Sequence, residues 1–162
     1  MKGDIKSLML ARPGRWIAVA ESVTCGRLQA RIGAVSGASA YFRGGITAYT
    51  LDEKVRHLGV DRAAAKAVDC VSREVAEQMA RGACALFGAD FAAATTGYAE
   101  PLADPPVPQP FAWWAVARRT GEGRLEARSG RVDCPGADRV GAQERMADAA
   151  MAALADWIAS SP

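Results

Sequence analysis

The chain has 162 residues, with 20 basic and 18 acidic side chains and a net charge of +2, which fits one globular domain. Hydrophobic residues make up 50% and charged residues 23% of the sequence, which excludes a disordered or fibrous chain. No apolar run approaches the roughly 20 residues that span a bilayer, and no run of lysine and arginine indicates nucleic-acid binding. We therefore expect a single cytoplasmic domain over residues 1–162, with neither a nucleic acid nor a membrane as its partner.

The first fifty residues alternate between helical and strand patterns. Residues 2–12 predict a short helix that ends at Pro13-Gly14, and residues 16–20 form the unbroken apolar run of a strand buried on both faces. Thr24 is predicted to cap a second helix, because apolar residues then recur at helical spacing. Residues 41–50 predict a strand that is entered through two adjacent glycines.

The rest of the chain continues this alternation. It predicts a helix over residues 51–58, a longer helix that Ser72 caps and Gly88 follows, and a last helix capped by Asp138. It also predicts a strand over residues 91–96 and paired strands over 111–119 and 124–132. Five of the eight prolines fall within residues 101–110, which therefore predict an extended loop. Such an alternation of strands and helices is typical of a layered α/β domain.

Polar residues follow the two buried strands at the point where each strand ends. Ser22 comes directly after the first, and Thr96 and Gly97 close the second. Ligands of open α/β sheets bind at the carboxyl ends of strands, where helix N-termini point amide donors at anions. Ser22 is therefore a candidate nucleophile or a phosphate or carbonyl contact. The alternative, in which it only belongs to the cap of the next helix, stays open.

A serine nucleophile in this chain needs a base other than histidine. His57 is the one histidine and lies in a charged helical stretch, no cysteines are spaced as C-x-x-C, and asparagine is absent. These facts argue against a zinc site and a histidine triad. Burial lowers the pKa of a lysine amine enough for it to accept a proton. Lys54 follows the second strand, five residues after Tyr49, although a solvated surface lysine is the alternative.

Five segments, in order, match the patterns of a known family. Residues 20–26 resemble A-E-S-C-T-G-G, and residues 36–60 resemble P-G-S-S-A-Y-F-x-G-G-x-x-A-Y-S-N-x-x-K-x-x-L-G-V. Shorter matches lie at residues 71–76 (V-S-x-E-V-A), 96–101 (T-G-x-A-G-P) and 136–139 (G-D-R, with one residue inserted). Together they resemble the C-terminal domain of the CinA (competence-damage-inducible protein) family, whose stand-alone members include nicotinamide-nucleotide amidases.

This resemblance implies a three-layer α/β/α sandwich with a mixed, mostly parallel sheet. It also implies hydrolysis of the carboxamide of nicotinamide mononucleotide to nicotinic acid mononucleotide and ammonia, with no cofactor and no metal. By position, Ser22 is the nucleophile, Lys54 its base and Tyr49 an assisting residue. The residues then expected to bind substrate are Ser39, Thr24, Thr96, Gly97 and Arg139. We expect a homo-oligomer that acts on a small amide or nucleotide.

Several positions depart from the family patterns. Val23 and Cys25 replace a cysteine and a glycine beside the predicted nucleophile, so a backbone amide there is less accessible. Glu100 replaces a glycine, and Gln109 and Gln143 stand where cations are expected. Phosphate recognition relies on backbone amides and cations, so we expect weak or absent hydrolysis of nicotinamide mononucleotide. A less anionic amide or a bulkier apolar group is the expected substrate.

Two readings other than an amidase remain open. The first is a catalytically inactive relative that binds a nucleotide or another small ligand without turnover. The second is an interaction module in which Trp113 and Trp114 serve a protein interface. An amidase requires Ser22, Tyr49 and Lys54 to meet in a cavity, whereas a binding protein requires the cavity but not the contact between serine and lysine.

Overall fold

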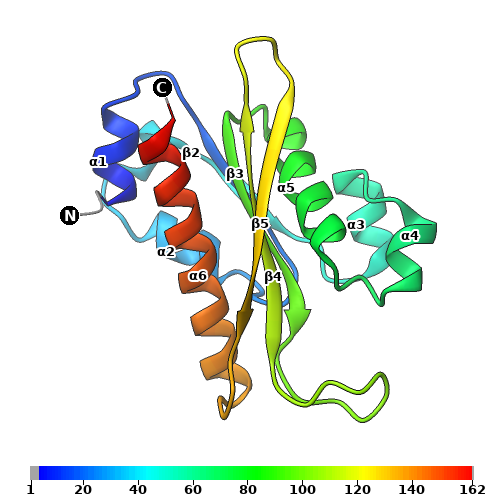
Figure 1. Ribbon diagram of the computed structural model, residues 1–162. Coiled ribbons are helices and arrows are strands. Elements are labelled where there is room, and N and C mark those ends of the chain that lie inside the picture. The colour runs from blue at the N-terminus through cyan, green and yellow to red at the C-terminus, as the bar shows by residue number, and fades with distance from the viewer. Residues whose placement is uncertain (1–3, 162) are drawn as a thin grey trace.

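The computed structural model describes residues 4–161 and places a five-stranded sheet between two layers of helices (Figure 1). The strands are β1 (Ile17–Glu21), β2 (Phe42–Thr47), β3 (Phe91–Tyr98), β4 (Phe111–Arg119) and β5 (Leu125–Asp133). The helices are α1 (Ile5–Leu10), α2 (Arg27–Gly33), α3 (Leu51–Leu58), α4 (Arg62–Ala67), α5 (Arg73–Phe87) and α6 (Arg139–Ser160), with a 3-10 turn at Ala38–Ala40. None of the helices among residues 4–161 combines the length and the apolar character needed to cross a membrane.

The sheet is mixed, in the order β2-β1-β3-β4-β5. Strand β1 pairs in parallel with both β2 and β3, while β3 with β4 and β4 with β5 are antiparallel. The predicted α/β sandwich with a mixed sheet is confirmed. Parallel pairs make up two of the four pairings rather than most of them, because β4 runs antiparallel both to β3 and to its hairpin partner β5.

Helices cover both faces of the sheet (Figure 1). In β1, Ile17 and Val19 face the layer that contains α6, while Ala18 and Ala20 face the layer that contains α5. Successive side chains of a strand point to opposite faces, so a strand covered on both sides is apolar throughout. This packing explains the unbroken apolar run that predicted β1.

The predicted helix boundaries hold at the two long helices. Ser72 caps α5, which ends at Gly88 in the left-handed region, and the Asp138 carboxylate accepts from the amide of Gly141 at the start of α6. Of the helix predicted over residues 2–12, the structure describes α1, capped by Asp4; residues 2 and 3 lie outside the described part.

The predicted cap of α2 is wrong. The helix begins at Arg27, and its cap residue is Gly26 (φ +97°). Glycine has no side chain that could accept a hydrogen bond from the first amides of the helix. Thr24 instead donates its hydroxyl to the carboxylate of Glu21 at 2.6 Å. The Glu21 carboxylate, and not Thr24, accepts the hydrogen bonds at the start of α2. The backbone amides of Gly26, Leu28 and Gln29 donate to its oxygens at 2.8–3.0 Å.

Candidate active site

Ser22 lies at the carboxyl end of β1, the central parallel strand. Its amide donates to the carbonyl of Thr95 on β3 at 3.1 Å, while Ala48, after β2, donates to the carbonyl of Glu21 at 2.9 Å. The three parallel strands therefore end at one edge of the sheet. Thr50 caps α3 just after β2, and the first turns of this helix carry Lys54 to the same edge.

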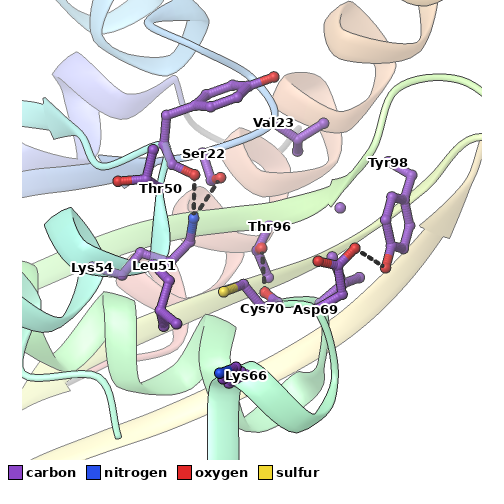
Figure 2. Close-up of a pocket in the computed structure, with 13 residues that line it drawn as sticks. Ser22, Val23, Thr50, Leu51, Lys54, Lys66, Asp69, Cys70, Thr96 and Tyr98 are labelled. Carbon is purple, nitrogen blue, oxygen red and sulfur yellow. Dashed lines mark hydrogen bonds between the residues drawn. The ribbon is translucent and has the colours of Figure 1, made fainter. Parts of the chain in front are cut away.

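The side chains of Ser22 and Lys54 are in direct contact. The Nζ atom of Lys54 lies 2.9 Å from the Oγ atom of Ser22 and donates to the backbone carbonyl of Tyr49 at 2.8 Å (Figure 2). Lys54 is 1% exposed and Ser22 8% exposed. The lysine head group is thus held in one position against the serine hydroxyl, without bulk water around it.

Burial lowers the pKa of the Lys54 amine below its usual value of 10.5, because desolvation disfavours the charged form. Cys70 and Asp69 act in the opposite direction, since negative charge near the amine favours its protonated form. Desolvation is the larger effect. A greater share of Lys54 is therefore neutral near neutral pH than for a solvated lysine, and a neutral amine beside a hydroxyl can accept its proton.

Ser22 and Lys54 line a cavity of about 410 Å³. This volume is in the range of small-molecule sites. Other residues that line it are Tyr49, Asp69, Cys70, Thr96, Gly97 and Tyr98. Thr96 donates its hydroxyl to the carbonyl of Cys70 at 2.6 Å, which ties the end of β3 to the segment before α5 (Figure 2).

Arg139, at the start of α6, lies beside this cavity. It lines an adjoining hollow of about 130 Å³ that also contacts Tyr49, Gly97 and Glu100. Its guanidinium donates to the Tyr49 hydroxyl at 3.2 Å and pairs with the Glu100 carboxylate at 2.7 Å. The Glu100 hydrogen bond is the largest cause of a raised pKa of Arg139. The cation predicted to contact substrate thus already has an anionic partner.

Two residues predicted to bind substrate are not brought to the cavity. Ser39 is exposed in the 3-10 turn before β2; since β1 and β2 run parallel, it lies at the opposite edge of the sheet from Ser22. Thr24 is fully buried, and its hydroxyl is 2.6 Å from Glu21 and 2.8 Å from that of Thr95. It holds the turn after β1 and does not line the cavity.

The residues that depart from the family patterns have structural partners. Gln143 is buried and donates its side-chain amide to the carbonyl of Val23 at 2.9 Å. Gln109 donates to Asp133 at 3.3 Å. Cys25 keeps the left-handed backbone (φ +46°) that glycine adopts more readily, and its amide donates to the carbonyl of Ser22 at 3.1 Å.

Sequence reasoning assigned no role to four groups of the site. The carboxylate of Glu21 is fully buried and organises the turn that carries Ser22. The sequence carried two signals for it: an acid at the end of an apolar run, and the second position of the A-E-S-C-T-G-G match. The amides of Val23 and Thr24 donate to no acceptor in residues 4–161. Asp69 reaches the cavity from a loop that carries no motif. Across the same described part, no cluster of His, Cys, Asp and Glu is arranged to hold a metal.

A family model, the CinA C-terminal domain, matches residues 4–158. This chain belongs to the CinA C-terminal domain family. A CinA-like protein of Chlorobium limicola is 41% identical over 146 residues, which cover 88% of this chain and 33% of that protein. A CinA-like protein of Mycobacterium tuberculosis is 39% identical over 149 residues, 92% of this chain and 34% of the relative. This CinA domain thus spans about a third of the length of these curated relatives.

Solved structures support the same assignment. The competence damage-inducible protein A from Klebsiella pneumoniae has a TM-score of 0.83 and 29% identity, over 99% of this chain and 96% of that one. A CinA superfamily protein from a second strain of that species has a TM-score of 0.82 and 28% identity, over 96% and 94% of the two chains. The CinA fold therefore accounts for nearly the whole chain.

Proposed function

We propose that this CinA domain is an amidohydrolase that converts a carboxamide to a carboxylate and ammonia, with Ser22 as nucleophile and Lys54 as base. The observation that carries the proposal is the 2.9 Å contact between a buried lysine amine and the serine hydroxyl. The lowered pKa of Lys54 supports it, because a base must be unprotonated to act. His57, bound to Glu53 on the surface of α3, is not placed to serve instead.

The proposed reaction has two steps. Neutral Lys54 takes the proton of Ser22 while the Oγ atom attacks the carbonyl carbon, and Lys54 then gives that proton to the leaving nitrogen, so that ammonia departs. Water then gives a proton to Lys54 while its oxygen attacks the carbonyl carbon of the resulting ester. Lys54 returns that proton to the departing Oγ atom of Ser22, and the acid product ionises to the carboxylate. We assign the free amides of Val23 and Thr24 to the developing oxyanion, because amides next to a nucleophile are suited to that charge.

The charges beside the cavity bear on the substrate. The family resemblance implies nicotinamide mononucleotide, whose phosphate needs cationic contacts. Arg139 is paired with Glu100, and Gln143 is bound to Val23. We therefore propose that nicotinamide mononucleotide is a poor substrate and that a less anionic amide is preferred.

A binding protein without turnover is the second candidate. The observation that favours it is that Asp69 and Cys70 counteract the lowering of the Lys54 pKa. A lysine that stays protonated at working pH holds Ser22 in place but does not activate it. In that case the cavity retains a ligand that it does not hydrolyse.

Ammonia release from a series of carboxamides, including nicotinamide mononucleotide, tests the proposal. We expect Ser22→Ala to lower the rate by on the order of a thousandfold or more. Lys54→Arg keeps the charge but cannot deprotonate, and should lower the rate by on the order of a hundredfold or more. Lys6→Arg, on α1 and away from the cavity, is the matched control and should keep the wild-type rate. No ammonia from any amide, with ligand binding retained, would favour the binding protein.

We further propose that the domain works in the cytoplasm as a homo-oligomer, on a small amide rather than on a nucleic acid or a membrane. The near balance of 20 basic and 18 acidic residues supports a small-molecule partner. Sedimentation velocity of the purified chain measures its oligomeric state, and a monomer at micromolar concentration would contradict that part of the proposal.

A further inference from the structure

Four arginines line a second cavity, of about 180 Å³, at the edge of the sheet opposite Ser22. It lies where β3 begins and β4 ends, beside the segment between α1 and β1. Figure 1 shows α1, the end of α6 and the turn between β4 and β5 at this end of the sheet. The lining residues that matter here are Arg12, Arg15, Arg118, Arg119, Thr120 and Ser161.

This cluster carries more positive charge than its acidic neighbours neutralise. Two of the arginines have acidic partners, in the pairs Arg15–Asp90 at 2.9 Å and Arg118–Glu126 at 3.1 Å. Arg12 and Arg119 form no ion pair with a carboxylate of residues 4–161. Like charges held close together raise the free energy of the folded state, and an anion placed between them lowers it.

Backbone carbonyls hold the two arginines that lack acidic partners. Arg12 donates to the carbonyl of Leu8 at 3.0 Å and to that of Ser161 at 2.9 Å. Arg119 donates at 3.2–3.4 Å to the carbonyls of Cys84, Ala89 and Gly123. A guanidinium has five N–H donors, so both groups are fixed in place and still keep donors for a ligand. Groups that are fixed before binding lose little entropy when a ligand arrives.

A hydroxyl without a partner belongs to the wall of the same cavity. Thr120 lines the cavity, and its Oγ1 atom is buried and has no hydrogen-bond partner within residues 4–161. Buried polar atoms in native proteins are almost always hydrogen-bonded, so an unpartnered one indicates a bound water or ion. A hydroxyl beside arginines is a further donor for an anion.

The volume and the charge of the cavity together indicate the kind of anion. Sites that enclose a whole small molecule have about 300–1,000 Å³, and a water takes up about 30 Å³ in the liquid. A cavity of about 180 Å³ therefore suits a group of a few heavy atoms. The forked guanidinium matches the oxygens of a phosphate. A phosphate group carries about −1.5 to −2 charges at neutral pH, which balances two guanidinium charges, whereas a carboxylate balances one.

We propose that this cavity is a phosphate site, in which Arg12, Arg119 and Thr120 bind a phosphate group that is either inorganic phosphate or the end of a larger molecule. It lies at the edge of the sheet away from Ser22 and Lys54, so it does not depend on the proposed amidase. Bound phosphate stabilises the folded chain, because the site exists only where α1, β4 and the end of α6 come together.

Calorimetric titration of inorganic phosphate into the full chain, at about pH 8 and constant ionic strength, tests the site. We expect a dissociation constant below about 1 mM, and binding of acetate, a monoanion, that is at least about tenfold weaker. Arg12→Gln removes a charge that has no acidic partner, and should weaken phosphate binding by about tenfold or more. Arg124→Gln is the matched control. It removes the same charge from an exposed position between β4 and β5 that does not line the cavity, and should change the dissociation constant less than about twofold.

A second variant separates phosphate binding from folding. Arg12→Lys keeps the charge and a donor for the backbone carbonyls but lacks the fork, so it should weaken phosphate binding several-fold. Thermal melts without phosphate check that both Arg12 variants fold, and the wild-type unfolding midpoint should rise as phosphate is added.

Glycerol 3-phosphate distinguishes the two sources of the phosphate group. Affinity equal to that of inorganic phosphate supports a site for the free ion, and tighter binding supports a site for the end of a larger molecule. No binding at millimolar phosphate, the result expected if an anion of the chain itself fills the cavity, would overturn the proposal. Acetate that binds as tightly as phosphate would also overturn it. So would phosphate binding that both Arg12 variants leave unchanged, because the ion would then lie elsewhere.

Discussion

Replacing Lys54 with methionine removes a buried amine while keeping a side chain of similar length. In the folded chain this amine has a pKa below its usual value of 10.5, whereas in the unfolded chain it is solvated. Between those two pKa values the unfolded chain binds more protons than the folded chain. The free energy of unfolding of the wild type therefore rises with pH through this window, up to about pH 10.5, and the methionine variant lacks this contribution.

The magnitude follows from two opposing terms. Each unit by which the pKa is lowered destabilises the wild type by about 1.4 kcal/mol at pH values below the window. The variant loses the hydrogen bonds from Lys54 to Ser22 and to the Tyr49 carbonyl, each worth about 0.5–1.5 kcal/mol. The stability of the variant relative to the wild type should therefore be highest at neutral pH. Toward pH 10.5 it should fall until the variant is about 1–3 kcal/mol less stable.

Urea unfolding followed by tryptophan fluorescence at several pH values between 7 and 10 measures this difference. The comparison between variant and wild type cancels the titration of groups that both proteins share. Lys66→Met is the matched control, because Lys66 is exposed, and its difference from wild type should not change with pH. A difference for Lys54→Met that is equally flat would show that the amine keeps an ordinary pKa, and the argument for Lys54 as base would fail.

Two further predictions concern carboxylates. The buried carboxylate of Glu21 accepts four hydrogen bonds, and Glu21→Gln replaces it with an amide that has one acceptor oxygen. The unfolding midpoint in a thermal melt should therefore fall by about 10 °C. An unchanged midpoint would contradict this role of Glu21. Glu100→Gln should free Arg139 for a phosphate and so lower the Michaelis constant for nicotinamide mononucleotide several-fold. It should change the free energy of unfolding little, because both side chains of the ion pair are about half exposed. A Michaelis constant equal to that of the wild type would show that the ion pair does not limit phosphate binding.

Local signals predicted most of the secondary structure. The helix expected over residues 51–58 is α3. The side chains of Ser72 and Asp138 accept hydrogen bonds from the first amides of α5 and α6, as expected of cap residues. These features depend on a few consecutive residues, so sequence spacing is sufficient to find them. The cap of α2 was missed because its acceptor, Glu21, lies five residues before the first amide that it binds, on the preceding strand.

The spacing of apolar and polar residues along the chain is sufficient to predict the strand and helix segments, the apolar faces that become the core, and the candidates Ser22 and Lys54. Which of these candidates come into contact depends on how the strands are ordered in the folded sheet. Ser22 and Lys54 are 32 residues apart in the chain yet 2.9 Å apart in space, because β1 and β2 are parallel neighbours that end at the same edge. Ser39, closer to Ser22 in sequence, lies at the other edge for the same reason. Asp69 and the pairing of Glu100 with Arg139 had no sequence signal, because strand order and register, not local spacing, set the distance between separate elements.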